Sequence, residues 1–103
     1  MNLKTLSALA GSIMMLLTAL PIMADDVSYQ QARALREAGA ILPLERIIEI
    51  AKTIKPGEVI DTGLEEDDGL YEYEIEILDA NGRVWEMEFD AATGELMDLE
   101  LDD

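Results

Sequence analysis

Carboxylate side chains occupy every second position of the stretch YEYEIEIL, residues 71–78. Glu72, Glu74 and Glu76 alternate there with aromatic and aliphatic residues. A period of two is typical of a β-strand with one buried face and one solvent-exposed (wet) face. A row of like charges on the wet face could bind a cation or a basic protein, or it could be only the solvated side of a sheet.

The same alternation returns in RVWEMEF (residues 83–89) and ELMDLEL (residues 95–101). If Ile77 pairs with Trp85 and Phe89 pairs with Met97, the two connections become three-residue loops, 80–82 and 92–94. Each loop then ends in glycine, as hairpins of this type require. Packing and turn chemistry therefore predict one register for three antiparallel strands.

This register sets carboxylates directly opposite one another on the wet face, where like charges destabilise a sheet. The predicted pairs are Glu76 with Glu86, Glu74 with Glu88, Glu88 with Asp98, and Glu86 with Glu100. The candidate partner-binding face consists of Glu72, Glu74, Glu76, Glu86, Glu88, Asp98 and Glu100.

Three interpretations of this face remain open at the level of sequence. It is a solvated surface, a docking surface for a lysine- and arginine-rich protein, or a weak site for divalent cations. Calcium requires six to eight oxygens that converge from a bent loop, whereas side chains on a flat sheet diverge. No loop matches the calcium-loop pattern, so we predict no dedicated metal site.

Composition narrows the classes of function. The chain has 103 residues and a net charge of −16, which repels nucleic acids and anionic membrane surfaces and favours cations or basic proteins. It contains no histidine and no cysteine, the residues on which zinc sites, redox metals and most nucleophilic catalysis depend. We therefore expect a protein that is not an enzyme and carries no cofactor.

The N-terminal segment has the pattern of a secretory signal peptide. Lys4 precedes an uncharged run, residues 6–24, in which Pro21 is followed by small Ala24 and then by acidic residues. We predict cleavage after Ala24, which gives a signal peptide at 1–24 and a single domain at 25–103. The alternative is a retained membrane anchor, because the uncharged run is nearly long enough to span a bilayer. The predicted location is periplasmic or secreted, with no membrane attachment after cleavage.

The remaining pattern predicts an α+β fold. A short helix should begin after Ser28, in a capping box with Gln31, and end near Gly39. A longer amphipathic helix should occupy most of the segment 42–57, where Pro56 and Gly57 end it. Four strands follow from Glu58 onward, so the expected architecture is one long and one short helix packed on a four-stranded antiparallel meander. The first connection is either a two-residue turn at Asp67–Asp68 or a four-residue loop, 66–69.

Three segments in order resemble the PepSY domain family. They are GAILPLERIIEIAK, YEYEIEILDANGR and EFDAATGEL, and the resemblance covers residues 33–100. It implies an α+β regulatory domain of the kind found in the propeptides of secreted metallopeptidases, and it offers no catalytic residues to assign. The expected function is a non-enzymatic extracytoplasmic module that binds a protein of the cell envelope, such as a peptidase or a sensor. The alternatives are weak calcium binding or buffering, and inhibition of a metallopeptidase in trans.

Overall fold

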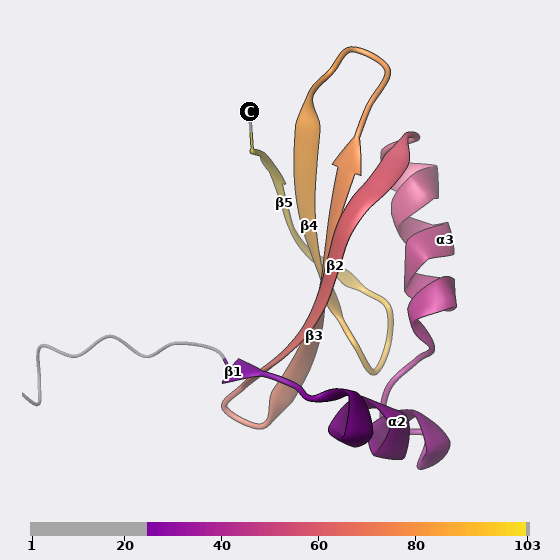
Figure 1. The fold of residues 1–103 in the computed structure, drawn as a ribbon, viewed down its shortest axis with the longest axis vertical. Coiled ribbons are helices and arrows are strands. Elements are labelled where there is room, and N and C mark those ends of the chain that lie inside the picture. The colour runs from indigo at the N-terminus through magenta and orange to yellow at the C-terminus, as the bar shows by residue number, and fades with distance from the viewer. Residues whose placement is uncertain (1–24, 103) are drawn as a thin grey trace, which may run out of the picture.

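The computed structural model describes residues 25–102, so the predicted signal peptide lies outside the described residues. Two helices and five strands form an α+β domain, with one helix along one face of an antiparallel sheet (Figure 1). The elements are β1 (Asp25–Asp26), α2 (Tyr29–Glu37), α3 (Leu44–Ile54), β2 (Glu58–Asp67), β3 (Leu70–Leu78), β4 (Val84–Asp90) and β5 (Leu96–Leu101).

The sheet is a meander in which strands follow in chain order from β1 to β5. The prediction of four strands is therefore wrong by one. The missed strand is β1, where Asp25 pairs with Glu66 and Asp26 with Glu65. Two consecutive aspartates have low β-propensity, so nothing in their type signals a strand.

Both predicted helices are present, but α3 spans only Leu44–Ile54 of the segment 42–57, so with 11 residues it is little longer than the nine-residue α2. The Ser28 side chain accepts a hydrogen bond from the backbone of Gln31, and the Gln31 side chain caps the Ser28 N–H, which confirms the capping box. Helix α3 begins one residue after Pro43, whose extended backbone serves as the N-cap. Its apolar stripe faces the sheet because residues three and four apart lie on one side of a helix.

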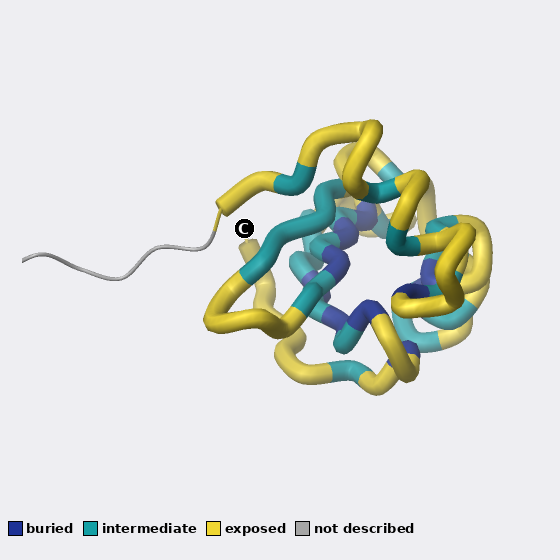
Figure 2. Tube along the Cα trace, turned by 90° about the horizontal axis from the view of Figure 1, so that it is seen from below, coloured by how far each residue is buried: buried dark blue, intermediate teal, exposed yellow. Residues whose placement is uncertain are grey.

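The core lies between α3 and the inner face of the sheet (Figure 2). Ile47 and Ala51 of α3 are fully buried there. The Tyr73 hydroxyl donates to the carbonyl of Leu42 at 2.6 Å, which ties β3 to the segment between the helices. The core consists of Ile41, Ile47, Ala51, Tyr73, Ile75, Ile77, Met87, Phe89 and Ala91.

The predicted register of the hairpin between β3 and β4 is confirmed. Ile77 pairs with Trp85. The Asp79 N–H donates to the carbonyl of Arg83 at 2.9 Å, which leaves residues 80–82 as the loop. Gly82 has a φ of 81°, the left-handed backbone that this loop type demands.

The predicted register of the next hairpin is wrong near its turn. Phe89 pairs with Leu96 rather than with Met97, because the register shifts between Glu88 and Phe89. Asp90 donates to the carbonyl of Glu95, so the loop has four residues, 91–94, instead of three. A bulge inserts one unpaired residue into a strand, and Met97 is that residue, with half of its surface exposed.

Strand β2 also differs from simple alternation. The register shifts between Val59 and Asp61, which leaves Ile60 as a bulged residue with 47% of its surface exposed. Val59 instead packs against the core. The turn into β3 has two residues, as one alternative expected, but they are Asp68 and Gly69, both with positive φ.

Candidate functional site: an acidic sheet face

The face of the sheet opposite α3 carries three rows of carboxylates that run across the strands. The first row crosses four strands, because each member pairs directly with the next. It consists of Asp61, Glu76, Glu86 and Glu100. Side chains of directly opposed residues lie about 4.5–5.5 Å apart at Cβ, so each carboxylate in the row has a like charge beside it.

Two further rows lie parallel to the first. One consists of Gly63, Glu74, Glu88 and Asp98, and the other of Asp26, Glu65, Glu72 and Asp90. Every position in the three rows except Gly63 therefore holds a carboxylate. We call this surface the acidic face.

The structure brings together all seven residues that the sequence proposed for the face, and the four predicted cross-strand pairs all form. It adds Asp26, Asp61, Glu65 and Asp90, which sequence reasoning did not include. Asp61 and Asp90 could have been found, because each continues an alternating pattern by two positions. Glu65 could have been found in the same way, because it follows Gly63 by two positions on β2 and pairs with Glu72. Asp26 alone depends on β1, which has no sequence signal.

Basic side chains do not neutralise the acidic face. Among residues 25–102, no lysine or arginine occupies a position in the three rows. Arg46 and Glu49 form the ion pair found in this part of the chain, at 3.5 Å, and both lie on α3. The other basic residues are Arg33, Arg36, Lys52, Lys55 and Arg83. Apart from Arg83, which lies in the hairpin between β3 and β4, these basic residues lie on or directly after the two helices, and the sheet face opposite α3 is left negative.

Crowding of carboxylates changes their protonation. Partial burial and, after it, the charges of Glu86, Glu65, Glu76 and Glu88 together raise the pKa of Glu74 from 4.5 to about 7. Both causes act in the same direction because each disfavours the charged form. Glu74, at the centre of the face, therefore exchanges a proton near neutral pH.

The neighbours of Glu74 show the same effect. Partial burial is the first cause that raises the pKa values of Glu72, Glu86 and Glu88 above the usual value, and surrounding carboxylates add to it. A basic group placed against the face would favour the charged forms again. The arrangement can therefore accept protons or attract cations.

Two groups of carboxylates come close enough to share a cation. Oxygens of Asp61, Glu74 and Glu76 lie within 4.8 Å of one another, and so do those of Glu76, Glu86 and Asp102. With one oxygen from each side chain, a cluster supplies three of the six to eight oxygens that calcium takes. The geometry suits weak association of an ion that keeps part of its water.

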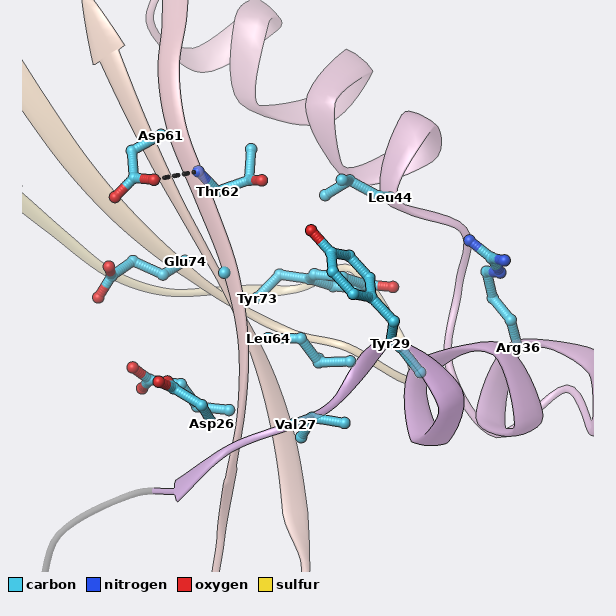
Figure 3. A pocket seen from close by; sticks show the side chains of 13 residues that line it. Asp26, Val27, Tyr29, Arg36, Leu44, Asp61, Thr62, Leu64, Tyr73 and Glu74 are labelled. Atoms are coloured by element: carbon cyan, nitrogen blue, oxygen red, sulfur yellow. Dashed lines mark hydrogen bonds between the residues drawn. The ribbon is translucent and has the colours of Figure 1, made fainter.

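A recess of about 520 Å³ lies at the free edge of β2, between β1, α2 and the start of α3. In Figure 3, the carboxylates of Asp26, Asp61 and Glu74 point to one side of β2, and Leu44 and Leu64 lie on the other. The Thr62 N–H donates to the carboxylate of Asp61 at 3.0 Å (Figure 3). The recess therefore joins the acidic face to apolar side chains.

Trp85 lies on the inner face and does not contribute to the acidic face. Its indole N–H donates to a carboxylate oxygen of Asp79 at 2.8 Å, and the ammonium of Lys55 lies 3.8 Å from the ring centroid. Both contacts have structural explanations, because they close the hairpin and attach the end of α3 to it. No ligand role is needed for this residue.

The arrangement of helices and sheet agrees with a comparison to known protein families. The family described as peptidase propeptide and YPEB domain, PepSY, matches residues 41–100, from the entry to α3 through β5. A comparison with curated proteins and with solved structures gives no significant match. Among residues 25–102, no helix has the length and apolar character needed to cross a bilayer.

Proposed function

The chain belongs to the PepSY family, and on that premise we propose that it is a non-enzymatic extracytoplasmic module that binds a basic surface of an envelope protein through its acidic face. The family description names peptidase propeptides, which supports a regulatory role beside a peptidase. The observation that carries the proposal is the set of three carboxylate rows without a basic neighbour in any of them.

The loss of stability caused by the paired carboxylates supports a functional interpretation of the acidic face. Like charges directly opposite each other destabilise a sheet, and each exposed pair costs a few tenths of a kcal/mol by the scale of surface ion pairs. Solubility needs a net charge of magnitude about 2–8 for a small domain, far below the −16 of this chain. A basic partner would convert the repulsion within the rows into attraction across an interface.

Retention from an envelope extract tests the proposal when matched variants are compared. Immobilised wild-type protein is expected to retain a partner at low salt and release it as salt screens the charges. Glu74→Gln with Glu88→Gln should lose that partner. The control is Glu37→Gln with Glu49→Gln, which removes the same charge from the helices and should keep it. Equal retention by both double variants would contradict the proposal.

A trans-acting inhibitor of a metallopeptidase is a narrower form of the same proposal. It is favoured by the family description, which names peptidase propeptides. Micromolar protein should then slow a secreted metallopeptidase in a peptide-cleavage assay, and the Glu74→Gln, Glu88→Gln variant should slow it less. Unchanged cleavage with every such enzyme tested would remove this form and leave the binding module.

Weak calcium binding or buffering is the second candidate, and the two clusters of three carboxylates favour it. Titration calorimetry should show heat on addition of calcium that disappears in Glu76→Gln, because Glu76 belongs to both clusters. Stabilisation that sodium chloride reproduces would show screening alone and would argue against a calcium site.

A further inference from the structure

Strand β5 forms an edge of the sheet. In the order β1 to β5 it pairs with β4 on one side, and no strand of residues 25–102 pairs with the other. An open edge offers unpaired backbone N–H and C=O groups to an added strand.

The backbone groups of Leu99 and Leu101 point toward this open side. The Asp102 N–H donates to the carbonyl of Val84 at 2.7 Å, which marks these two residues as a hydrogen-bonded pair. Bonded and non-bonded pairs alternate along an antiparallel ladder. Leu101 with Trp85 and Leu99 with Met87 are then non-bonded pairs, so the leucine backbone groups face away from β4.

The side chains along this edge alternate between apolar and acidic. Leu99 and Leu101 lie on the inner face and expose 36% and 52% of their surface. Neither belongs to the apolar residues that pack against the core. Asp98 and Glu100 lie on the other side and end two rows of the acidic face.

The opposite edge of the sheet is blunted, unlike β5. On β2, the first residues are interrupted by the bulge at Ile60, the Thr62 N–H already donates to Asp61, and β1 pairs with Glu65 and Glu66. Bulges and covered edges are the devices by which proteins prevent strand addition. Strand β5 has a bulge only at its first residues, near Met97.

We propose that β5 binds an extended segment of a basic partner, which adds to the sheet as a sixth strand. The segment alternates basic with apolar residues, so that its basic side chains extend the carboxylate rows at Asp98 and Glu100 and its apolar side chains cover Leu99 and Leu101. A second copy of this chain is a poor occupant, because β5 against β5 would bring Asp98 and Glu100 of each copy together. This inference rests on the proposed function and names the mode of contact.

A pair of synthetic peptides tests the inference. One is a capped nine-residue peptide that alternates lysine with valine, and the other has the same composition with its lysines and valines in separate blocks. Strand addition requires alternation, since side chains of a strand point to opposite faces in turn. We expect the alternating peptide to bind about tenfold more tightly than the blocked one. The blocked peptide loses at least one good apolar contact, and such a loss weakens binding by about this factor.

Matched variants separate strand addition from attraction by charge alone. Leu101→Glu on β5 and Ile60→Glu on β2 add the same charge at residues of similar exposure, 52% and 47%. Strand addition predicts that Leu101→Glu weakens binding of the alternating peptide about tenfold, whereas Ile60→Glu does not weaken it. Binding that is equal or tighter in Leu101→Glu would overturn strand addition and leave the acidic face as a binding surface.

Amide hydrogen exchange of the wild-type protein gives a test that needs no variant. The N–H groups of Leu99 and Leu101 should exchange rapidly in the free protein and slowly with the alternating peptide. Protection by the peptide at residues 61–63 instead would show that the other edge of the sheet binds it. Protection of β5 that grows with protein concentration in the absence of peptide would show that the occupant is a second copy of the chain. Either result would overturn the inference. Failure of both peptides to bind at low salt would overturn the proposed function together with this inference.

Discussion

Glu74 of β3 lies directly opposite Glu88 of β4, at the centre of three rows of carboxylates. Both side chains have raised pKa values, first because they are partly buried and then because other carboxylates surround them. The pair therefore stores electrostatic repulsion that a proton, a cation or a basic partner can relieve. The predictions below follow from this relationship and from the contacts that hold the sheet.

Stability should increase as the pH falls from 8 to 5. The pKa of Glu74 rises from 4.5 to about 7 on folding, so the folded protein holds this proton more tightly than the unfolded chain. The resulting stabilisation is complete below 4.5 and is lost as pH rises through about 7. We expect about 1–2 kcal/mol less free energy of unfolding at pH 8 than at pH 5, after allowance for solvent screening.

Urea denaturation at several pH values measures this effect. Glu74→Gln should flatten the profile and stabilise the protein at pH 8, because the repelling charge is gone. Glu37→Gln, which removes a charge from α2, is the control for net charge. A wild-type stability that is constant between pH 5 and 8 would disagree with the structure.

Gly63→Lys should stabilise the protein. Gly63 is the gap in the carboxylate rows, opposite Glu74, and an added Cβ would meet no atom within 4 Å. A lysine at this position would form a cross-strand ion pair with Glu74, which contributes about 0.2–1 kcal/mol to the free energy of unfolding. Thermal unfolding at pH 7.5 measures the change, and Gly63→Ala is the control for the added side chain itself. No difference between the lysine and alanine variants would show that the rows carry no net repulsion.

Much of the acidic face could be predicted from the sequence, because alternation assigns each residue of β3 and β4 to a face. The register followed from pairing Ile77 with Trp85, and the glycine at position 82 agreed with it. The bulges at Ile60 and Met97 could not be predicted, because a bulge is one extra residue whose position depends on packing in three dimensions. Strand β1 could not be predicted either, since it consists of two aspartates held by pairing alone.

Gly57→Ala should destabilise the protein. A Cβ on Gly57 would lie 2.6 Å from Cγ2 of Ile77 and would also contact the backbone carbonyl of Leu78. Overpacking against a buried residue costs about 1–3 kcal/mol. Urea denaturation measures the loss of stability. Gly63→Ala within β2, where an added Cβ meets no atom within 4 Å, should cost much less. Equal stability of the two alanine variants would argue against this close approach of the chain before β2 to the end of β3.

Asp79→Ala should loosen the hairpin between β3 and β4. The Asp79 carboxylate accepts hydrogen bonds from the backbone of Asn81 and Arg83 and from the Trp85 indole, at 2.8–2.9 Å. These hydrogen bonds lower the pKa of Asp79, and the bond from the Trp85 indole has the largest effect. Their contribution to stability is therefore present above the ordinary pKa of 3.8 and is lost as the pH falls below it. Asn81→Ala, in the same loop, is the matched control.

The measurements for this hairpin are amide exchange and tryptophan fluorescence. In Asp79→Ala the amides of Asn81 and Arg83 should exchange faster, and the emission of Trp85 should shift toward that of a solvated indole. Asn81→Ala should change neither. An unaltered tryptophan spectrum in Asp79→Ala would mean that the indole contact does not position Trp85.

The carboxyl titration of Glu74, followed by carbon-detected NMR with and without the alternating lysine–valine peptide, tests the central claim most directly. The account predicts a midpoint near 7 in the free protein and a lower midpoint with the peptide bound, because ammonium groups favour the charged form. A midpoint near 4.5 in the free protein, or one that bound peptide does not lower, would contradict the claim that the acidic face is a strained surface relieved by a basic partner.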